Sequence, residues 1–170
     1  MQETLTHIGD LTPDPRNPRK HGQRNIGTIV KSLEEVGAGR SIVIDEDNVI
    51  LAGNGLIEAA GIAGIERLRV VEADGNEIIA VRRSGLTDKQ KKRFAVLDNR
   101  AGELAEWNPA VMGELAAEMN LTDLFNADEM SRIFDTFAVP DFEPVGIDEQ
   151  GRLDEKKQCT CPECGHTFTP

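Results

Sequence analysis

The stretch from Ser41 to Ile65 most narrows what this chain can fold into. Two short β-rich runs, 42–44 and 49–51, flank an Asp/Asn turn, a pattern typical of a β-hairpin. The sequence Gly53-Asn54-Gly55 follows directly and opens a helix-forming run. A strand, a tight glycine turn and a helix start leave backbone N–H groups unbonded at the positive end of a helix. Such a turn can bind phosphate, and a plain glycine turn into a helix is the alternative interpretation.

Charge divides the 170-residue chain into a balanced part and an acidic part. Residues 1–102 carry 15 acidic and 15 basic side chains, whereas residues 103–155 carry 14 acidic and 2 basic ones. A balanced domain can still bind phosphate locally, while the acidic part would repel nucleic acid and favour a basic partner. No apolar run approaches the length of a membrane span and no signal peptide opens the sequence, so we expect a cytoplasmic protein without membrane contact.

Local patterns predict a small α+β domain with a mixed sheet over residues 1–102. Besides the hairpin, strands are expected at 5–8, 67–72 and 77–82, the last two joined by the Asp74-Gly75 turn. Helices are expected from an Asn25 cap to about Glu35, from 56 to about 63, and from a Thr87 capping box to 98–100. Three prolines predict an extended loop without regular structure at 10–19. That loop opens a cluster of basic side chains: Arg16, Arg19, Lys20, His21 and Arg24.

Three further segments are expected after this domain. Residues 103–138 form an acidic helical extension, in which Asn108-Pro109 begins one helix and Leu121 through Phe137 forms another. Residues 139–158, rich in proline, glycine and carboxylates, are typical of a linker. Residues 159–170 form a zinc-knuckle-like tail.

The tail concentrates residues that can bind zinc. Its Cys-Pro-x-Cys-Gly sequence spaces two thiols as in a knuckle turn, and four candidate ligands occur within eight residues. These candidates are Cys159, Cys161, Cys164 and His166. Because Cys159 and Cys161 are closely spaced, one knuckle completed by another chain is an alternative, and a tail of reduced thiols is another.

A second basic cluster surrounds the start of the helix that follows Thr87. It consists of Arg82, Arg83, Lys89, Lys91, Lys92 and Arg93. Such a cluster can contact the phosphate backbone of DNA, and a solvated helix face is the alternative.

Several of these motifs together match a known domain. They are Asn17-Pro18-Arg19, Ser32-Leu33 with Gly37, Ile42-Val43-Ile44-Asp45, Leu51-Ala52-Gly53 with Glu58-Ala59-Ala60, Gly64, and the stretch from Asp98-Asn99-Arg100 to Trp107-Asn108-Pro109. Over residues 1–110 the chain resembles the N-terminal domain of the ParB/sulfiredoxin superfamily, in particular its stand-alone phage or prophage versions. The resemblance implies the small α+β fold predicted above.

The resemblance also implies a nucleotide site at Gly53-Asn54-Gly55, with CTP or ATP and Mg²⁺ as the expected ligands. Partitioning ParB proteins use a Gly-Glu-Arg-Arg turn, and both arginines are absent from Gly53-Asn54-Gly55-Leu56. Asp98-Asn99 matches the pair that holds the metal, so Asp98 is the expected magnesium ligand. The phosphate-binding candidates are Arg19, Arg40, Gly53, Asn54, Gly55, Asn99 and Arg100. The sulfiredoxin cysteine is missing from the turn, which excludes that chemistry.

Three functions follow from these expectations. The first is a nucleotide- or DNA-associated binding protein of a phage or mobile element. The second is a phosphotransferase or nuclease of the same fold that uses Asp98 or Glu58 with a metal, so whether the protein is an enzyme stays open. The third is a non-catalytic adaptor for a DNA methyltransferase or another phage protein. A homodimer is one of the oligomeric states left open.

Overall fold

The computed structural model describes residues 3–135, 159–161 and 163–168. The chain divides into two compact units, Met1–Thr136 and Phe137–Pro170. The first unit has mixed α+β structure, as the sequence predicts. None of the helices in the described part of the chain has the length and apolar character needed to span a lipid bilayer.

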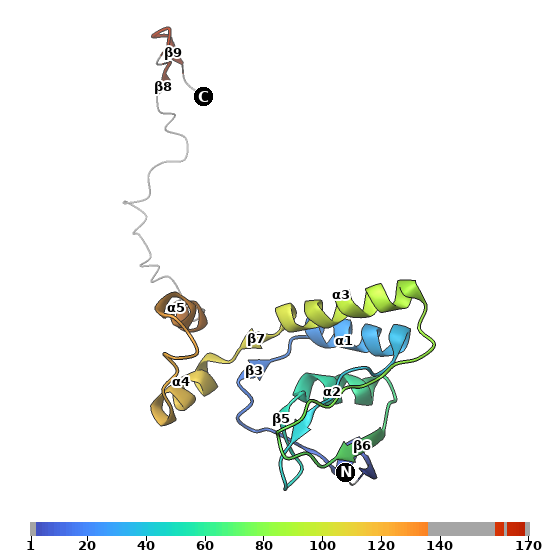
Figure 1. Cartoon of the computed structure of the whole chain (residues 1–170). Coiled ribbons are helices and arrows are strands. Elements are labelled where there is room, and N and C mark those ends of the chain that lie inside the picture. The colour runs from blue at the N-terminus through green and yellow to red at the C-terminus, as the bar shows by residue number, and fades with distance from the viewer. Residues whose placement is uncertain (1–2, 136–158, 162, 169–170) are drawn as a thin grey trace. The chain divides into compact units, whose positions relative to one another are not determined.

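Three helices form the centre of the first unit (Figure 1). Helix α1 (Gln23–Val36) packs against both α2 (Asn54–Ile62) and α3 (Asp88–Leu104). The core between α1 and α2 consists of Ile26, Leu33, Ala59 and Ala60. Since Ala59 is fully buried and has a one-carbon side chain, the two helix backbones can approach closely there.

Short strands surround these helices. Strand β1 (Glu3–His7) leads through a 3₁₀ turn (Ile8–Asp10) and pairs antiparallel with β6 (Arg67–Val71). Strand β5 (Val49–Ala52) pairs antiparallel with β4 (Val43–Ile44) and parallel with β2 (Thr12–Pro13). Strand β3 (Arg19–Lys20) pairs antiparallel with β7 (Glu106–Trp107). The predicted 42–51 hairpin is confirmed. The proline-rich loop at 10–19 differs from expectation, because Thr12–Pro13 and Arg19 belong to strands of two different sheets.

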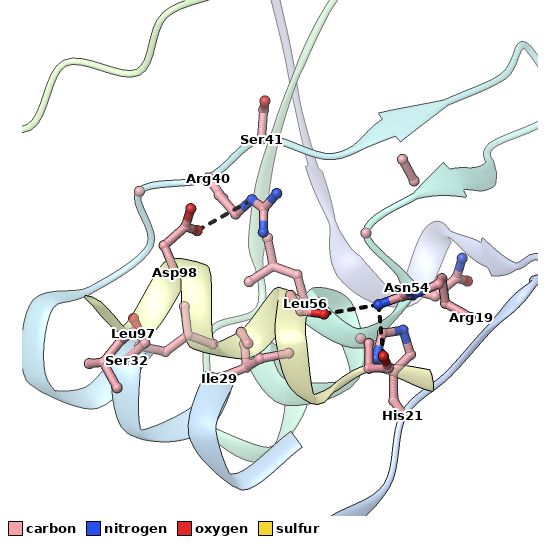
Figure 2. A pocket seen from close by; sticks show the side chains of 18 of the residues that line it. Arg19, His21, Ile29, Ser32, Arg40, Ser41, Asn54, Leu56, Leu97 and Asp98 are labelled. Carbon is pink, nitrogen blue, oxygen red and sulfur yellow. Dashed lines mark hydrogen bonds and ion pairs between the residues drawn. The ribbon is translucent and has the colours of Figure 1, made fainter. Parts of the chain in front are cut away.

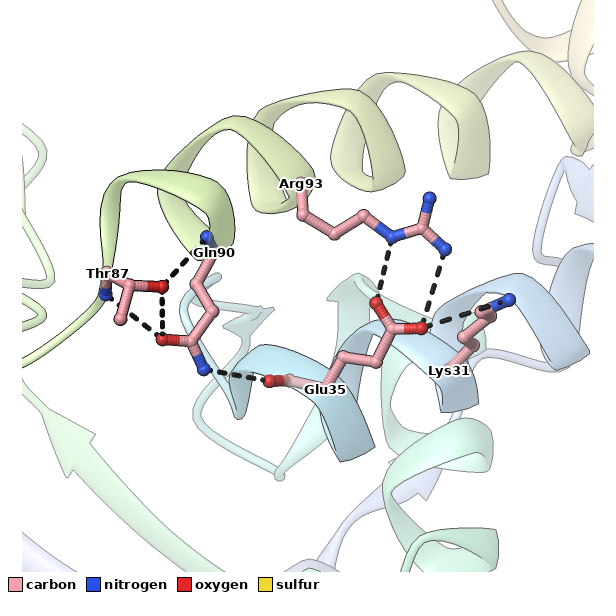
Figure 3. Close-up of polar contacts among 5 residues, drawn as sticks. All are labelled: Lys31, Glu35, Thr87, Gln90 and Arg93. Carbon is pink, nitrogen blue, oxygen red and sulfur yellow. Dashed lines mark hydrogen bonds and ion pairs between the residues drawn. The ribbon is translucent and has the colours of Figure 1, made fainter.

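Polar contacts join the C-terminal turn of α1 to the first turns of α3 (Figure 3). The Thr87 and Gln90 side chains form the predicted capping box at the start of α3. Gln90 Nε2 also donates to the backbone oxygen of Glu35 at 3.3 Å, and Arg93 Nε donates to the Glu35 carboxylate at 2.8 Å. The Arg93 guanidinium is the main reason that the pKa of Glu35 lies below its ordinary value. These bonds fix the register between α1 and α3, which together form one side of the site described below.

The predicted strand at 77–82 is wrong. Strand β6 has β1 as its partner, and residues 77–82 form no strand. Ile78, expected in the sheet, is 96% exposed. The Arg83 guanidinium donates to the backbone oxygens of Val36 and Ala38 at the end of α1, which holds this part of the chain at the helix.

Two predicted helix boundaries are also corrected. Helix α1 begins after Gly22, and Asn25 lies inside it with a buried side chain instead of capping it. Helix α3 continues past 98–100 to Leu104, and the Arg19 guanidinium binds backbone oxygens at its C-terminal end.

In the acidic extension, α4 (Pro109–Glu118) starts at the predicted Asn108-Pro109, whereas the last helix is shorter than expected. Helix α5 spans Ala127–Asp135, because the Asn126 side chain accepts from Glu129 N–H and the Glu129 carboxylate accepts from Asn126 N–H. This reciprocal pair is a capping box that sets the helix start. Leu121, expected in the helix, instead packs with Met112 and Ile133 in a small separate core. The predicted linker at 139–158 lies outside the described residues.

Candidate functional site

A cavity of about 360 Å³ opens between α1, α3 and the turn that joins β5 to α2. Its wall is completed by the proline-rich loop and by the segment between α1 and β4. Pockets of roughly 300–1,000 Å³ are typical of small-molecule sites. The lining includes six of the residues proposed from the sequence: Arg19, Arg40, Gly53, Asn54, Gly55 and Asp98.

The glycine turn forms the β5–α2 side of this pocket. Gly53 has φ of 108°, and a Cβ atom there would lie 2.4 Å from Ile42 Cγ2. A Cβ atom on Gly55 would lie 2.7 Å from His21 Nδ1. Both positions therefore require glycine, since a side chain would meet Ile42 or His21.

The start of α2 offers unbonded donors. The N–H groups of Leu56 and Ile57 both donate to the Gly53 oxygen, at 2.9 and 3.1 Å. The N–H groups of Asn54 and Gly55 precede them in the first turn and have no acceptor within the helix. Because the positive end of the helix dipole lies at the same place, this turn favours an anion.

The Asn54 side chain connects the turn to its neighbours. Its Oδ1 accepts the N–H of Asp14 at 3.1 Å, and its Nδ2 donates to the Ile50 oxygen at 3.2 Å. These bonds hold the proline-rich loop against the end of β5. Asn54 therefore positions the pocket wall with its side chain and offers a ligand only its backbone N–H.

Arg40 and Asp98 form an ion pair at the pocket, with 3.4 Å between Arg40 Nε and Asp98 Oδ1. Figure 2 shows this pair on one side of Leu56, with Arg19, His21 and Asn54 on the other. The Arg40 side chain is 60% exposed, so the pair is solvated and contributes little to stability. An anionic ligand could therefore bind Arg40 in place of Asp98 at a low cost in free energy.

Arg19 has mostly structural contacts. One terminal nitrogen of its guanidinium donates to the backbone oxygens of Gly102 and Ala105, at 2.9 and 2.8 Å (Figure 2). The guanidinium also lies 4.6 Å from the centre of the Trp107 ring. Burial lowers the pKa of Arg19 from its ordinary value. These contacts fasten the end of α3 to strand β3.

His21 was not among the predicted site residues, yet its side chain lines the pocket. Its Nδ1 lies 2.7 Å from Oδ1 of Asn25, whose Nδ2 donates to the Ala101 oxygen at 2.6 Å. Asn25 is 1% exposed. The four-residue spacing of His21 and Asn25 could have indicated this contact, but the sequence patterns placed His21 in a loop and Asn25 at a helix cap.

Other predicted site residues lie elsewhere. Glu58 is exposed on α2 and does not line the pocket. The Asn99 amide donates to the Ala95 oxygen within α3, and Arg100 pairs with Glu103 at 2.6 Å. The structure therefore does not bring Asn99 to the pocket beside Asp98, because consecutive helical residues point in directions about 100° apart.

The basic cluster around the start of α3 is only partly available to a partner. Arg83 binds the end of α1, Lys91 pairs with Asp88 at 2.9 Å, and Arg93 pairs with Glu35. Arg82, Lys89 and Lys92 are exposed, and no ion pair to them is found within residues 3–135. Three of the six cations could thus contact phosphates without losing an internal bond.

The described part of the tail is a small hairpin of β8 (Cys159–Thr160) and β9 (Thr167–Phe168). Cys161 N–H donates to the His166 oxygen, and Gly165 N–H donates to the Cys161 oxygen, each at 2.9 Å. Hydrogen bonds from the backbone of Cys164 and Glu163 lower the pKa of the Cys161 thiol. Within the described ranges, no three His, Cys, Asp or Glu residues are grouped so as to hold a metal ion.

Comparison with known proteins gives one informative relative. Over 86 residues, which are 51% of this chain and 87% of the relative, the chain is 32% identical to the ParB-like nuclease domain-containing protein YnaK of Escherichia coli K12. No family model matches the chain.

Proposed function

The chain belongs to the family of ParB-like nuclease domain proteins, and on this premise we propose that its pocket binds the phosphate groups of a nucleotide, CTP or ATP. The observation that carries this proposal is the Gly53–Gly55 turn, whose residues line a 360 Å³ cavity and whose N–H groups at Asn54 and Gly55 have no acceptor within helix α2. Arg40, on the same pocket, supplies a cation that a phosphate can engage. The two arginines that the turn lacks are thus replaced in part by backbone donors and Arg40.

Magnesium fits this pocket through a single carboxylate. Asp98 is the lining carboxylate, and Mg²⁺ at nucleotide sites is commonly held by one or two carboxylates together with the phosphates. When a phosphate takes Arg40, the Asp98 carboxylate becomes available to the metal. Bound Mg²⁺ would neutralise phosphate charge that the missing arginines cannot.

A matched pair of variants tests the phosphate site by isothermal titration calorimetry with CTP and ATP plus Mg²⁺. Arg40→Gln should weaken binding about 10-fold or more, since a hydrogen bond to a charged group is worth about 1.5–3 kcal/mol. Arg100→Gln is the control: Arg100 is a half-exposed arginine in an ion pair but does not line the pocket. Equal losses in both variants, or no binding of either nucleotide by the unaltered protein, would refute the proposal.

We also propose that the protein contacts DNA, as a phage or mobile-element protein would. Exposed Arg82, Lys89 and Lys92 support this, because they can meet phosphates without breaking internal pairs. The nuclease alternative makes a separate prediction: DNA cleavage that depends on a divalent metal and is lost in Asp98→Ala.

For the tail we propose a zinc site built on Cys161 and Cys164. Backbone hydrogen bonds already favour the thiolate of Cys161, which is the form that binds metal. Cys159 and His166, or the same knuckle of a second chain, would complete a tetrahedral set. Zinc measured on the purified full chain should be lost in Cys161→Ser, and equal zinc content in that variant and the unaltered protein would contradict the site.

A further inference from the structure

His21 is held in one orientation by a chain of hydrogen bonds that begins in the interior. Asn25 Nδ2 donates to the Ala101 backbone oxygen at 2.6 Å. A carbonyl oxygen can only accept, so the amide nitrogen of Asn25 must face Ala101 and its Oδ1 must face His21. Because the Asn25 side chain is 1% exposed, water cannot replace either bond at low cost.

This arrangement fixes which ring nitrogen of His21 carries the proton. Asn25 Oδ1 only accepts, and it lies 2.7 Å from His21 Nδ1, so Nδ1 is the donor. In a neutral imidazole the other nitrogen, Nε2, is then an unprotonated acceptor. Among the described residues, every buried side-chain nitrogen or oxygen has a hydrogen-bond partner. Nε2 of His21 has no hydrogen bond within that part of the chain, so it cannot be a buried atom. Nε2 is therefore open to solvent.

The ring lies directly beside the anion-binding turn. A Cβ atom on Gly55 would lie 2.7 Å from His21 Nδ1 and 2.8 Å from Cε1, so the ring packs on the Gly55 backbone. The Gly55 N–H is one of the two N–H groups at the start of α2 that have no acceptor within the helix. Gly55 and His21 both line the pocket, so the N–H groups at the start of α2 and the His21 ring belong to the same cavity.

We propose that Nε2 of His21 accepts a hydrogen bond from a sugar hydroxyl of the nucleotide whose phosphate lies at the Gly53–Gly55 turn. This inference rests on the proposed nucleotide function and assigns His21 as a specificity-determining residue of the pocket. It selects ligands that carry a hydroxyl close to a phosphate over those that carry phosphate alone.

The tautomer can be measured without any ligand. In alkaline buffer, where histidines are neutral, ¹⁵N NMR of the full chain should show His21 protonated on Nδ1 and unprotonated on Nε2. His7 is an internal control with the opposite tautomer, because its Nδ1 accepts the Gly9 N–H at 2.8 Å and its Nε2 must carry the proton. A His21 signal with protonated Nε2 would overturn the inference whatever the protein binds.

The hydroxyl is tested by comparing CTP with 2′,3′-dideoxy-CTP, both with Mg²⁺. The unaltered protein should bind CTP about 3- to 10-fold more tightly, as expected for one net hydrogen bond. His21→Phe keeps a ring beside Gly55 but removes Nε2, so it should bind the two nucleotides equally. His21→Gln keeps an acceptor and should restore part of the preference, with circular dichroism to check that each variant is folded.

The outcomes separate the two claims. Equal binding of CTP and its dideoxy form by the unaltered protein overturns the assignment of His21 while leaving the phosphate site intact. If His21→Phe and His21→Gln lose the preference for CTP because they unfold, the circular dichroism spectrum shows it. The tautomer measurement on the unaltered protein then decides the inference. If neither nucleotide binds, the proposed function fails and the sugar-hydroxyl assignment falls with it.

Discussion

Replacing Gly53 by alanine tests how tightly the glycine turn is built. Gly53 has φ of 108°, and a methyl group there would meet Ile42 Cγ2 at 2.4 Å, Ile42 Cβ at 3.0 Å and the Ile42 Cα at 3.4 Å. The contact with Cα is of ordinary length, but Cβ at 3.0 Å does not move when the Ile42 side chain rotates, so a rotation cannot relieve all of the overlap. The strand and the turn would have to move apart.

Two costs make up the expected effect. An alanine at positive φ costs about 1–2 kcal/mol relative to glycine. Forcing an extra methyl group into a packed site costs typically about 1–3 kcal/mol. Gly53→Ala should therefore destabilise the protein by about 2–5 kcal/mol, a large share of the roughly 5–15 kcal/mol that stabilises a small domain.

Gly64 provides the matched control, because it has φ of 70° and nothing within 4 Å of the position of a Cβ atom. Gly64→Ala should show only the backbone cost, about 1–2 kcal/mol. Urea unfolding followed by circular dichroism gives the free energy of unfolding of both variants. The comparison is valid if the slope of that free energy against urea concentration is the same in the variants and the unaltered protein.

A second variant isolates the contact itself. In an Ile42→Ala background the Cγ2 atom is absent, so adding Gly53→Ala should cost less than it does in the unaltered protein. If Gly53→Ala costs no more than Gly64→Ala, or if Ile42→Ala leaves its cost unchanged, the packing of the turn described above is refuted.

Three further predictions concern the periphery of the site. Ile78→Asp should change the free energy of unfolding, measured in urea, by less than about 0.5 kcal/mol, because Ile78 is 96% exposed. A larger loss of stability would indicate that residues 77–82 form the strand expected from the sequence. If Arg82, Lys89 and Lys92, which have no ion pair within residues 3–135, contact DNA, the logarithm of the binding constant should fall with the logarithm of salt concentration at a slope of about −2.7. Lys92→Gln should reduce that slope by about 0.9, while Lys91→Gln, whose lysine pairs with Asp88, leaves it unchanged. Arg93 lowers the pKa of Glu35 from the ordinary 4.5, so the ion pair stabilises the fold above that pH, and this contribution is lost as the pH falls through the lowered pKa. Urea unfolding from neutral pH to about pH 3 should therefore show a smaller fall in the free energy of unfolding for Glu35→Gln than for the unaltered protein. An identical fall in both proteins would contradict the Glu35–Arg93 ion pair.

The elements predicted correctly are those whose signals are local. The hairpin at 42–51 and the Thr87 capping box depend on residues within a few positions of each other, and both are present. The α+β class follows from the same short-range patterns. The resemblance to ParB-like domains, carried by motifs such as Asn17-Pro18-Arg19, agrees with the relative from Escherichia coli.

The errors arise where a distant partner decides the structure. A strand at 77–82 was expected from its apolar residues and the Asp74-Gly75 turn, but β6 pairs with β1, which lies some sixty residues earlier. Asparagine is a residue type that commonly caps helices, yet the Asn25 side chain lies within the helix and bonds His21 and the Ala101 oxygen. Neither partner can be identified from local sequence.

The residues that line the pocket also differ in how local their sequence signals are. Gly53 and Gly55 stand out in the sequence because a strand and a helix flank them. His21 does not, since its role depends on Ala101, eighty residues away in the chain. Asn99 was expected beside Asp98 because the two match the metal-holding pair of the resembled superfamily, and Arg100 was a phosphate-binding candidate. In α3 the Asn99 amide bonds the Ala95 oxygen and Arg100 pairs with Glu103, and neither residue lines the pocket.

The most direct test of the central proposal is an NMR titration of the ¹⁵N-labelled full chain with CTP and ATP in the presence of Mg²⁺. Nucleotide phosphate at the turn should shift the backbone N–H signals of Asn54 and Gly55 at the start of α2, and the Arg40 Nε signal with them. The N–H signals of Ala63 and Gly64, beyond the other end of α2, should stay in place. Saturating shifts confined to the start of α2 and its pocket are the predicted result. An unchanged spectrum, or shifts that cluster away from this turn, would contradict the account.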